Sequence, residues 1–158
     1  MTATSGRSTA TAHISFSRPG KLRANGKSLF NSKYDLIVNG PSLSVFNTGA
    51  WQPSKDAEMG LATVTGLAGT APMTVSSLLL HTKWGSLEGP QFTVAEERLS
   101  GRDCYRLDRK GQMTLTAWID KKTHFLVKTK FSVMRTTVVV DFGAPRINKP
   151  IPASRFVK

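Results

Sequence analysis

Phe16-Ser17-Arg18-Pro19-Gly20-Lys21-Leu22-Arg23 is the stretch of sequence that decides the fold of this chain. Before it, over residues 9–16, polar and apolar residues alternate one by one. This period of two predicts a strand with one buried face. Pro19-Gly20 then predicts a turn, and Lys21-Leu22-Arg23 begins a second strand. The stretch therefore predicts an antiparallel β-hairpin.

The same alternation returns along most of the chain. It predicts further strands over residues 33–38, 43–46, 92–94, 105–107, 113–119, 124–133 and 136–142. Short turns separate them, among them Asn39-Gly40, a strong hairpin signal. Strands joined in this way predict an antiparallel meander. In the strand at 124–133, the alternation places Phe125 and Phe131 on one face, and Lys128 and Lys130 on the other.

One main helix is predicted, over residues 72–84. Thr70-Ala71-Pro72 has the composition of a helix start, and Gly85 is suited to a helix end. Apolar residues recur at helical spacing between them. The preceding residues, 47–71, are rich in glycine, threonine, alanine and serine, and they predict a long mobile loop with a short helix near residues 56–61.

The composition fits one globular domain with a basic surface. The chain has 158 residues, of which 39% are hydrophobic, and a net charge of +12. Residues 101–158 carry thirteen basic and four acidic side chains. This imbalance fits an anionic partner, but it also fits a solvated basic surface without any partner. The apolar runs are too short to span a membrane, and residues 1–7 are expected to be a disordered segment.

Several motifs that follow one another in a fixed order carry a resemblance to a known family. They are the corner at 18–23, the hairpin at 36–46, the segment at 99–107, the strand at 116–120, and a tail with Asn148, Pro152 and Phe156. In this order the chain resembles the bacterial lipoprotein-carrier superfamily (LolA/LolB-like), and most closely its families of exported proteins.

The resemblance implies a mainly β fold of the α+β class. A curved antiparallel sheet would form an unclosed half-barrel, with one main helix across its concave side. Residues 8–158 would be a single domain that lacks the family's usual N-terminal helix and first strand, and the exposed sheet edge could then support an oligomer. The resemblance also implies the periplasm or the cell envelope. This chain shows no signal peptide, so it would be cytoplasmic if Met1 is the true start.

The function implied by the resemblance is a non-enzymatic carrier or sensor, without cofactor or metal. It would bind a lipid, a lipoprotein acyl chain or another amphiphile in an apolar concave cavity. The candidate wall consists of apolar residues on the predicted strands: Ile14, Phe16, Leu36, Val38, Val45, Met113, Leu115, Ile119, Phe125, Val127, Phe131, Val138 and Val140. The same alternation equally fits an ordinary core packed by the helix.

The remaining candidate site residues surround this wall. Met73, Leu80 and Trp84 on the predicted helix would form the lid. The resemblance implies that the arginine of the Arg-Pro step, Arg18, switches the lid between open and closed states. Lys128 and Lys130 are candidate contacts for a head group or an anionic membrane. The expected partner is therefore a lipid or a lipidated protein.

Three alternatives from other functional classes deserve comparison. The groove could hold a protein segment instead of a lipid. The basic C-terminal segment could bind nucleic acid, but it lacks the aromatic platform that stacks bases. Catalysis by Cys104, His124 and Asp120 lacks support in the local sequence, because Cys104 is expected to be buried in a strand, away from a helix N-terminus. The histidines also lack the spacing of metal ligands.

Overall fold

A computed structural model of the chain describes residues 2–6, 8–28, 31–40, 42–47, 49–54, 79, 91–111, 113–133 and 136–158. Within these residues the fold is almost entirely β. The strands are β1 (Thr2–Ser5), β2 (Ser8–Ser17), β3 (Lys21–Lys27), β4 (Lys33–Asn39), β5 (Ser42–Asn47), β6 (Ala50–Pro53), β7 (Phe92–Leu99), β8 (Arg102–Arg109), β9 (Met113–Asp120), β10 (Leu126–Val133) and β11 (Thr136–Asp141). A short 3-10 helix, η1 (Ala153–Phe156), lies near the C-terminus.

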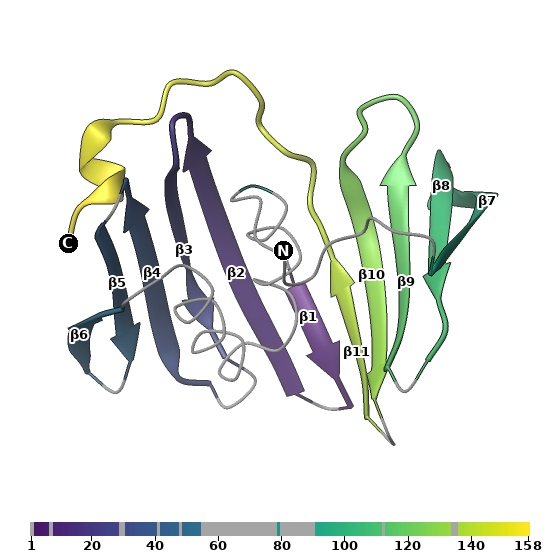
Figure 1. Cartoon of the computed structure of the whole chain (residues 1–158), viewed down its shortest axis with the longest axis horizontal. Helices are drawn as coiled ribbons and strands as arrows, with labels where there is room; N and C mark the ends of the chain where they lie inside the picture. Colours follow the sequence, from purple (N-terminus) through teal and green to yellow (C-terminus); the bar gives the residue numbers. More distant parts are fainter. Residues whose placement is uncertain are drawn as a thin grey trace.

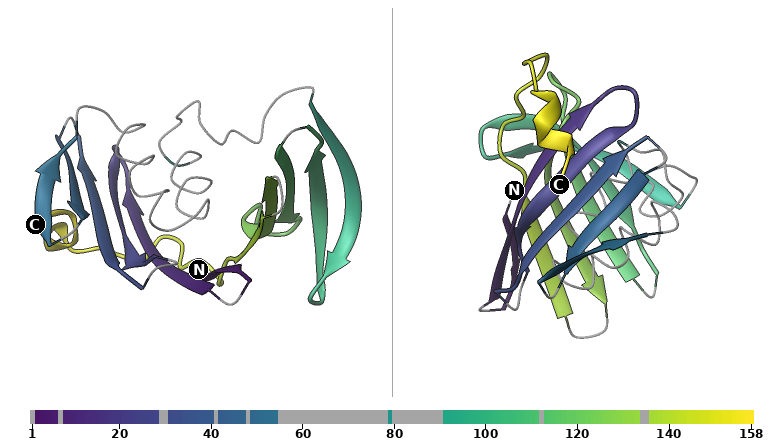
Figure 2. Two further views of the ribbon diagram at one scale, coloured as in Figure 1. Left: turned by 90° about the horizontal axis from the view of Figure 1, so that it is seen from below. Right: turned by 90° about the vertical axis from the view of Figure 1, so that its left-hand side faces the viewer.

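The strands form one antiparallel sheet in the order β6-β5-β4-β3-β2-β1-β11-β10-β9-β8-β7 (Figure 1). Each half of the chain is a meander, and the two meanders join where β1 pairs with β11. The sheet is open and strongly bent, so that it has the shape of a trough (Figure 2). The predicted curved antiparallel meander is therefore confirmed.

The register defines two faces of the sheet, since directly opposed residues on neighbouring strands point to the same side. Ala24 lies opposite Ile14 and Leu36 on the concave face. Arg23 lies opposite Ser15 and Ile37 on the convex face. The predicted division into an apolar and a polar face thus becomes the inside and the outside of the trough.

The C-terminal tail runs along one end of the sheet, and its last residues dock on the convex face (Figures 1 and 2). Helix η1 contacts β3 and β4, and Phe156 is buried, as is Ile37 on the convex face of β4. Arg23 donates to the carboxylate of Asp35 and, at 3.1 Å, to the backbone oxygen of Arg155. These contacts fix the end of the chain to the N-terminal meander.

The prediction that residues 1–7 are disordered was wrong for residues 2–5. They form β1, which pairs with β2 on one side and with β11 on the other, and so occupies the middle of the sheet. The segment Thr2-Ala3-Thr4-Ser5 is short and lacks large apolar residues, so its sequence gives no strand signal. Its backbone hydrogen bonds to two neighbouring strands hold it instead.

The prediction of a loop over residues 47–71 was wrong for residues 50–53. They form the edge strand β6, in which Trp51 lies opposite Phe46 of β5 with the ring centroids 5.6 Å apart. The short helix predicted near residues 56–61 lies outside the described residues. So does the main helix predicted over 72–84, except for Leu79. Leu79 has helical conformation and packs against the core of the N-terminal meander.

A third correction concerns the start of β10. The pairing with β9 shifts between Leu126, opposite Ile119, and Lys128, opposite Trp118. This bulge moves Leu126 to the concave face, whereas the uninterrupted alternation had placed it with the lysines. Phe125 precedes the strand and is 38% exposed.

Candidate functional site: the concave face of the sheet

The concave face of the N-terminal meander is a closed core. It contains Leu22, Ala24, Leu36 and Tyr34, each at most 2% exposed, and Leu79 packs against it. The Tyr34 hydroxyl donates to the backbone oxygen of Thr11 at 3.1 Å. Burial raises the pKa of Tyr34, so this hydroxyl stays protonated. Within the described residues, this part of the trough is therefore mostly buried, and Ile14 and Phe16 are its partly buried members.

The concave face of the C-terminal meander is different. Its fully buried core consists of Leu115 and Ala117, and larger apolar side chains around these two remain only partly buried: Phe92, Leu107, Ile119, Leu126 and Phe131. A smaller cluster of Ala10, Val138 and Val140 joins the two halves. The middle of the concave face is thus mostly apolar, with the buried Thr129 opposite Ala117, and the apolar side chains over β7 to β10 are only partly buried.

Cations lie at both ends of this open apolar surface. Arg109 lies opposite Leu115 and Phe92, and its guanidinium carbon is 5.7 Å from the centroid of the Phe92 ring. At the other end, the Lys121 ammonium lies 5.0 Å from the Tyr105 ring centroid and pairs with Glu96 at 2.6 Å. Arg109 forms no ion pair with a described residue.

Most of the predicted wall residues lie in these concave clusters: Ile14, Phe16, Leu36, Val38, Val45, Leu115, Ile119, Phe131, Val138 and Val140. The backbone of Met113 pairs with that of Val133 on β10. Phe125 and Val127 are exceptions, because the bulge places Leu126 on the concave face instead. Sequence reasoning also missed Phe92 and Leu107 as wall residues, although each is an apolar residue between two polar or charged neighbours.

The lid residues Met73, Leu80 and Trp84 lie outside the described residues. Arg18, the predicted switch, is exposed in the turn between β2 and β3. Phe16, two residues earlier, belongs to the concave cluster. Its side chain forms no ion pair with any residue that the structure describes. The role of Arg18 stays a prediction.

Lys128 and Lys130 lie on the convex face. They are opposite Trp118 and Thr116 of β9, and the Lys128 ammonium pairs with the Asp141 carboxylate at 3.1 Å. Because the apolar surface is on the other side of the sheet, these lysines cannot contact the head group of a ligand held in the trough. Only an outer surface contact remains open to them.

The convex face of the C-terminal meander carries a polar network. The Glu97 carboxylate accepts from the Arg106 guanidinium at 3.0 Å and from the Trp118 indole at 3.2 Å. Arg106 also donates to Asp108, and Asp108 accepts from the Thr116 hydroxyl at 2.8 Å. The hydrogen bond from Arg106, followed by that from Trp118, lowers the pKa of Glu97.

Cys104, Asp120 and His124 lie near one another in the fold. Cys104 is opposite Asp120, and the backbone N–H of His124 donates to the backbone oxygen of Asp120. Cys104 is fully buried, as predicted, and this burial raises the pKa of its thiol. A protonated, inaccessible thiol is a poor nucleophile, so the geometry offers no support for catalysis.

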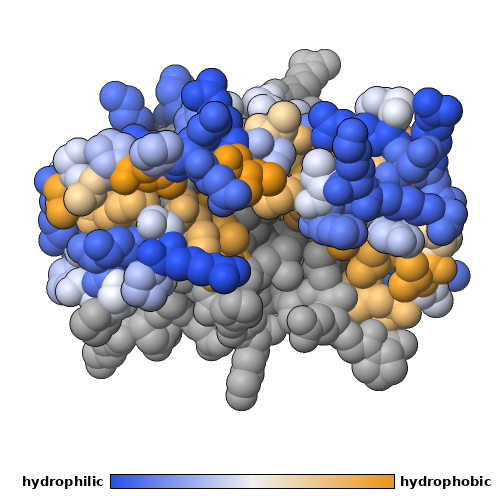
Figure 3. Space-filling view, turned by 90° about the horizontal axis from the view of Figure 1, so that it is seen from above, coloured by the Kyte–Doolittle hydropathy of each residue, from blue (hydrophilic) through white to orange (hydrophobic). Residues whose placement is uncertain are grey.

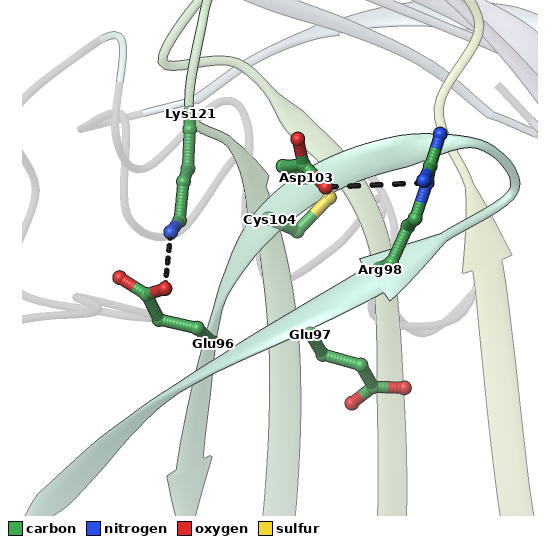
Figure 4. Close-up of a pocket in the computed structure, with 6 residues that line it drawn as sticks. All are labelled: Glu96, Glu97, Arg98, Asp103, Cys104 and Lys121. Carbon is green, nitrogen blue, oxygen red and sulfur yellow. Dashed lines mark ion pairs between the residues drawn. The ribbon is translucent and has the colours of Figure 1, made fainter.

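A hollow of about 390 Å³ beside the β7–β8 hairpin is lined by Glu96, Glu97, Arg98, Asp103, Cys104 and Lys121 (Figure 4). Figure 4 shows Lys121 reaching Glu96 and Arg98 reaching Asp103. A second hollow is lined by residues of β2 to β5, among them Tyr34 and Phe46. No residue of the predicted wall lines either hollow.

The described part of the chain holds no cluster of three or more histidine, cysteine or acidic side chains arranged to bind a metal ion. Among the same residues, no helix has the length and apolar character needed to cross a bilayer.

Comparison with known proteins finds similar solved structures. No protein-family model and no curated protein matches the sequence. LprF from Mycobacterium bovis is 13% identical, with 94% of this chain and 86% of that chain covered and a TM-score of 0.43. The Mycobacterium tuberculosis lipoprotein LppX is 14% identical, with coverage of 87% and 80% and a TM-score of 0.45.

A LolA superfamily protein from Nitrosomonas europaea is 11% identical, with 99% of this chain and 86% of that chain covered and a TM-score of 0.42. The chain resembles these structures in fold. At scores this low the likeness concerns the course of the chain and says nothing about a ligand.

Proposed function

We propose that this protein is a non-enzymatic carrier or sensor that binds the acyl chain of an amphiphile along the concave face of β7 to β10. The observation that carries the proposal is the surface of large, partly buried apolar side chains around Leu115 and Ala117. An acyl chain that covers this surface gains about 0.8 kcal/mol for each buried CH₂ group. The closed core of the N-terminal meander supports the trough without contributing binding surface.

The charge distribution favours an amphiphile with an anionic head group. Arg109 lies on the same face as Leu115, at the end of the apolar surface, and its guanidinium offers several donors to a carboxylate or phosphate. Lys121 at the other end is already paired with Glu96. The ligand would therefore lie with its chain across Leu107 and Ile119 and with its head group near Arg109.

A fluorescent fatty acid tests the proposal directly. Phe131→Glu places a charge on the concave face and should abolish binding of the probe. Val139→Glu is the matched control, because Val139 lies opposite Lys130 on the convex face of the adjacent strand. Both variants should keep the β-type circular dichroism spectrum. Equal probe binding by the wild type and Phe131→Glu would contradict the proposal, as would a wild type that binds no probe.

The head-group assignment has its own test. Arg109→Ala should weaken binding of a fatty acid more than binding of the fatty alcohol of the same length, because only the acid can pair with the guanidinium. If the affinities for the acid and the alcohol fall by the same factor, Arg109 contributes contact area and does not recognise the charge of the head group.

A second candidate function, the binding of an extended protein segment, is favoured by β7. This strand is at the edge of the sheet, pairs only with β8 among the described strands, and exposes 66% of Val94. An exposed edge can accept a further strand. A peptide partner would protect the β7 amides from hydrogen exchange. An amphiphile would cover the side chains of the trough instead and leave the exchange of the β7 amides unchanged.

A further inference from the structure

One end of the trough carries exposed cations and exposed apolar side chains side by side. Because the sheet is antiparallel, the β2–β3 turn, the β9–β10 turn and the end of β11 lie at the same end. The tail that follows β11 runs along this end before it reaches η1 (Figures 1 and 2). We call this end the tail rim.

The tail rim has cations without acidic partners. Arg18 lies in the β2–β3 turn, Lys122 in the β9–β10 turn, and Arg146 and Lys149 in the tail, and all of them are exposed. No ion pair joins any of them to a described residue. The acidic groups nearby are already engaged, since Asp141 pairs with Lys128 and Asp120 is 8% exposed.

Large apolar side chains are exposed between these cations. Phe125 is 38% exposed in the β9–β10 turn, and Ile147 is 49% exposed beside Arg146 in the tail. Figure 3, which looks onto this end of the molecule, shows hydrophobic patches among the hydrophilic residues. At the opposite end of the sheet, Lys27 and Lys33 are exposed on β3 and β4, whereas the large exposed apolar residue of β7 toward this end, Val94, lies at the other edge of the sheet.

The β9–β10 turn is built to hold its shape. The Asp120 carboxylate accepts from the backbone N–H groups of Lys122 and Thr123 at 2.9 and 2.8 Å, and from the Thr123 hydroxyl at 3.1 Å. The Asp120 N–H donates to the backbone oxygen of Phe125 at 2.9 Å. Because the turn is already ordered, Lys122 and Phe125 lose little freedom when a partner binds them.

We infer that the tail rim docks on the surface of a bilayer that contains anionic phospholipids. Exposed apolar tips such as Phe125 and Ile147 can enter the boundary between head groups and acyl chains, while the surrounding cations contact phosphate groups. Nucleic acid would satisfy the cations but would leave the aliphatic side chain of Ile147 unused. This docking is independent of the ligand proposed for the trough.

Co-sedimentation with vesicles tests the inference. The full chain should bind vesicles of phosphatidylcholine and phosphatidylglycerol, and bind poorly to phosphatidylcholine alone. Arg146→Ala with Lys149→Ala should weaken partitioning by about fivefold for each residue. Lys27→Ala with Lys33→Ala is the matched control, since it removes the same charge at the opposite end, and it should change partitioning much less.

The apolar part is tested by Ile147→Ser, which keeps every charge. This variant should weaken binding to the mixed vesicles and leave binding to a duplex oligonucleotide unchanged. Equal losses for the two double variants would show that only the net charge acts, and would overturn the inference. So would tight oligonucleotide binding that depends on Arg146 and Lys149, if vesicle binding does not. The fatty acid probe should bind all these variants equally, which separates this result from a failure of the trough.

Discussion

The two meanders of the sheet share a backbone design but differ in how they treat their apolar face. In the N-terminal meander, residues such as Leu22 and Leu36 are completely buried, and Leu79 packs over them. In the C-terminal meander, Leu115, Ala117, Val138 and Val140 are buried, but the large apolar side chains of Leu107, Phe131 and their neighbours stay partly exposed. The comparison shows that the apolar face of one half is mostly buried in the folded chain, whereas the other half keeps apolar side chains that folding leaves partly exposed.

The polar contacts on the convex faces of the two meanders also differ in how deeply they are buried. The N-terminal meander is fixed by the tail, through the contacts of Arg23 with Asp35 and with the backbone of Arg155. The C-terminal meander is held by the network around Arg106 and Glu97, whose side chains are 42% and 36% exposed, against 19% and 14% for Arg23 and Asp35. Hydrogen bonds between charged groups stabilise more where the groups are less exposed. The stability of the fold should therefore be concentrated in the N-terminal meander.

The largest effect should come from the two cores. Leu36→Ala removes a fully buried side chain and should lower the free energy of unfolding by about 2–5 kcal/mol. Leu107→Ala, at a partly buried position of the C-terminal meander, should cost about 1 kcal/mol. Urea unfolding of both variants measures the difference. Similar losses for the two would mean that the halves contribute equally to the core.

A smaller effect is expected at the tail. Arg23→Ala leaves the partly buried Asp35 carboxylate without its guanidinium and should cost about 2 kcal/mol. Hydrogen exchange of the tail should rise as η1 is released. Arg155→Ala removes only longer hydrogen bonds, to Ser15 at 3.3 Å and Asn25 at 3.4 Å, and should cost less. If neither substitution changes tail protection, other contacts of η1 hold the tail in place.

The smallest effect concerns the exposed network and depends on pH. Because the pKa of Glu97 is lowered in the folded state, its contribution is present above the ordinary glutamate pKa and is lost as the pH falls through the lowered value. Trp118 fluorescence should report this loss, since its indole donates to Glu97. Arg106→Ala should move the midpoint upward, and Glu97→Gln should remove the transition. A transition that persists in Glu97→Gln must come from another group.

The sequence predicted the strands other than β1 and β6, and most of the concave face, because both depend on a local period of two. On uninterrupted strands, wall residues from Ile14 to Val140 lie in the concave clusters, and their role as a ligand-binding wall stays a prediction. The predictions failed at Phe125 and Val127, where one extra residue in β10 shifts the register with β9. A bulge of this kind is set by the partner strand and leaves no mark in the alternation.

By itself, the sequence determined the alternation of side chains, the positions of the tight turns and the basic character of the C-terminal segment. These properties follow from neighbouring residues, whose side-chain directions and backbone preferences are local. Only the tertiary structure decided that Thr2–Ser5 join the two meanders, and that the tail docks by Phe156 on the convex face. It also decided which half of the apolar face stays open. Each of these depends on contacts between segments far apart in the chain, and burial is a property of those contacts rather than of any residue.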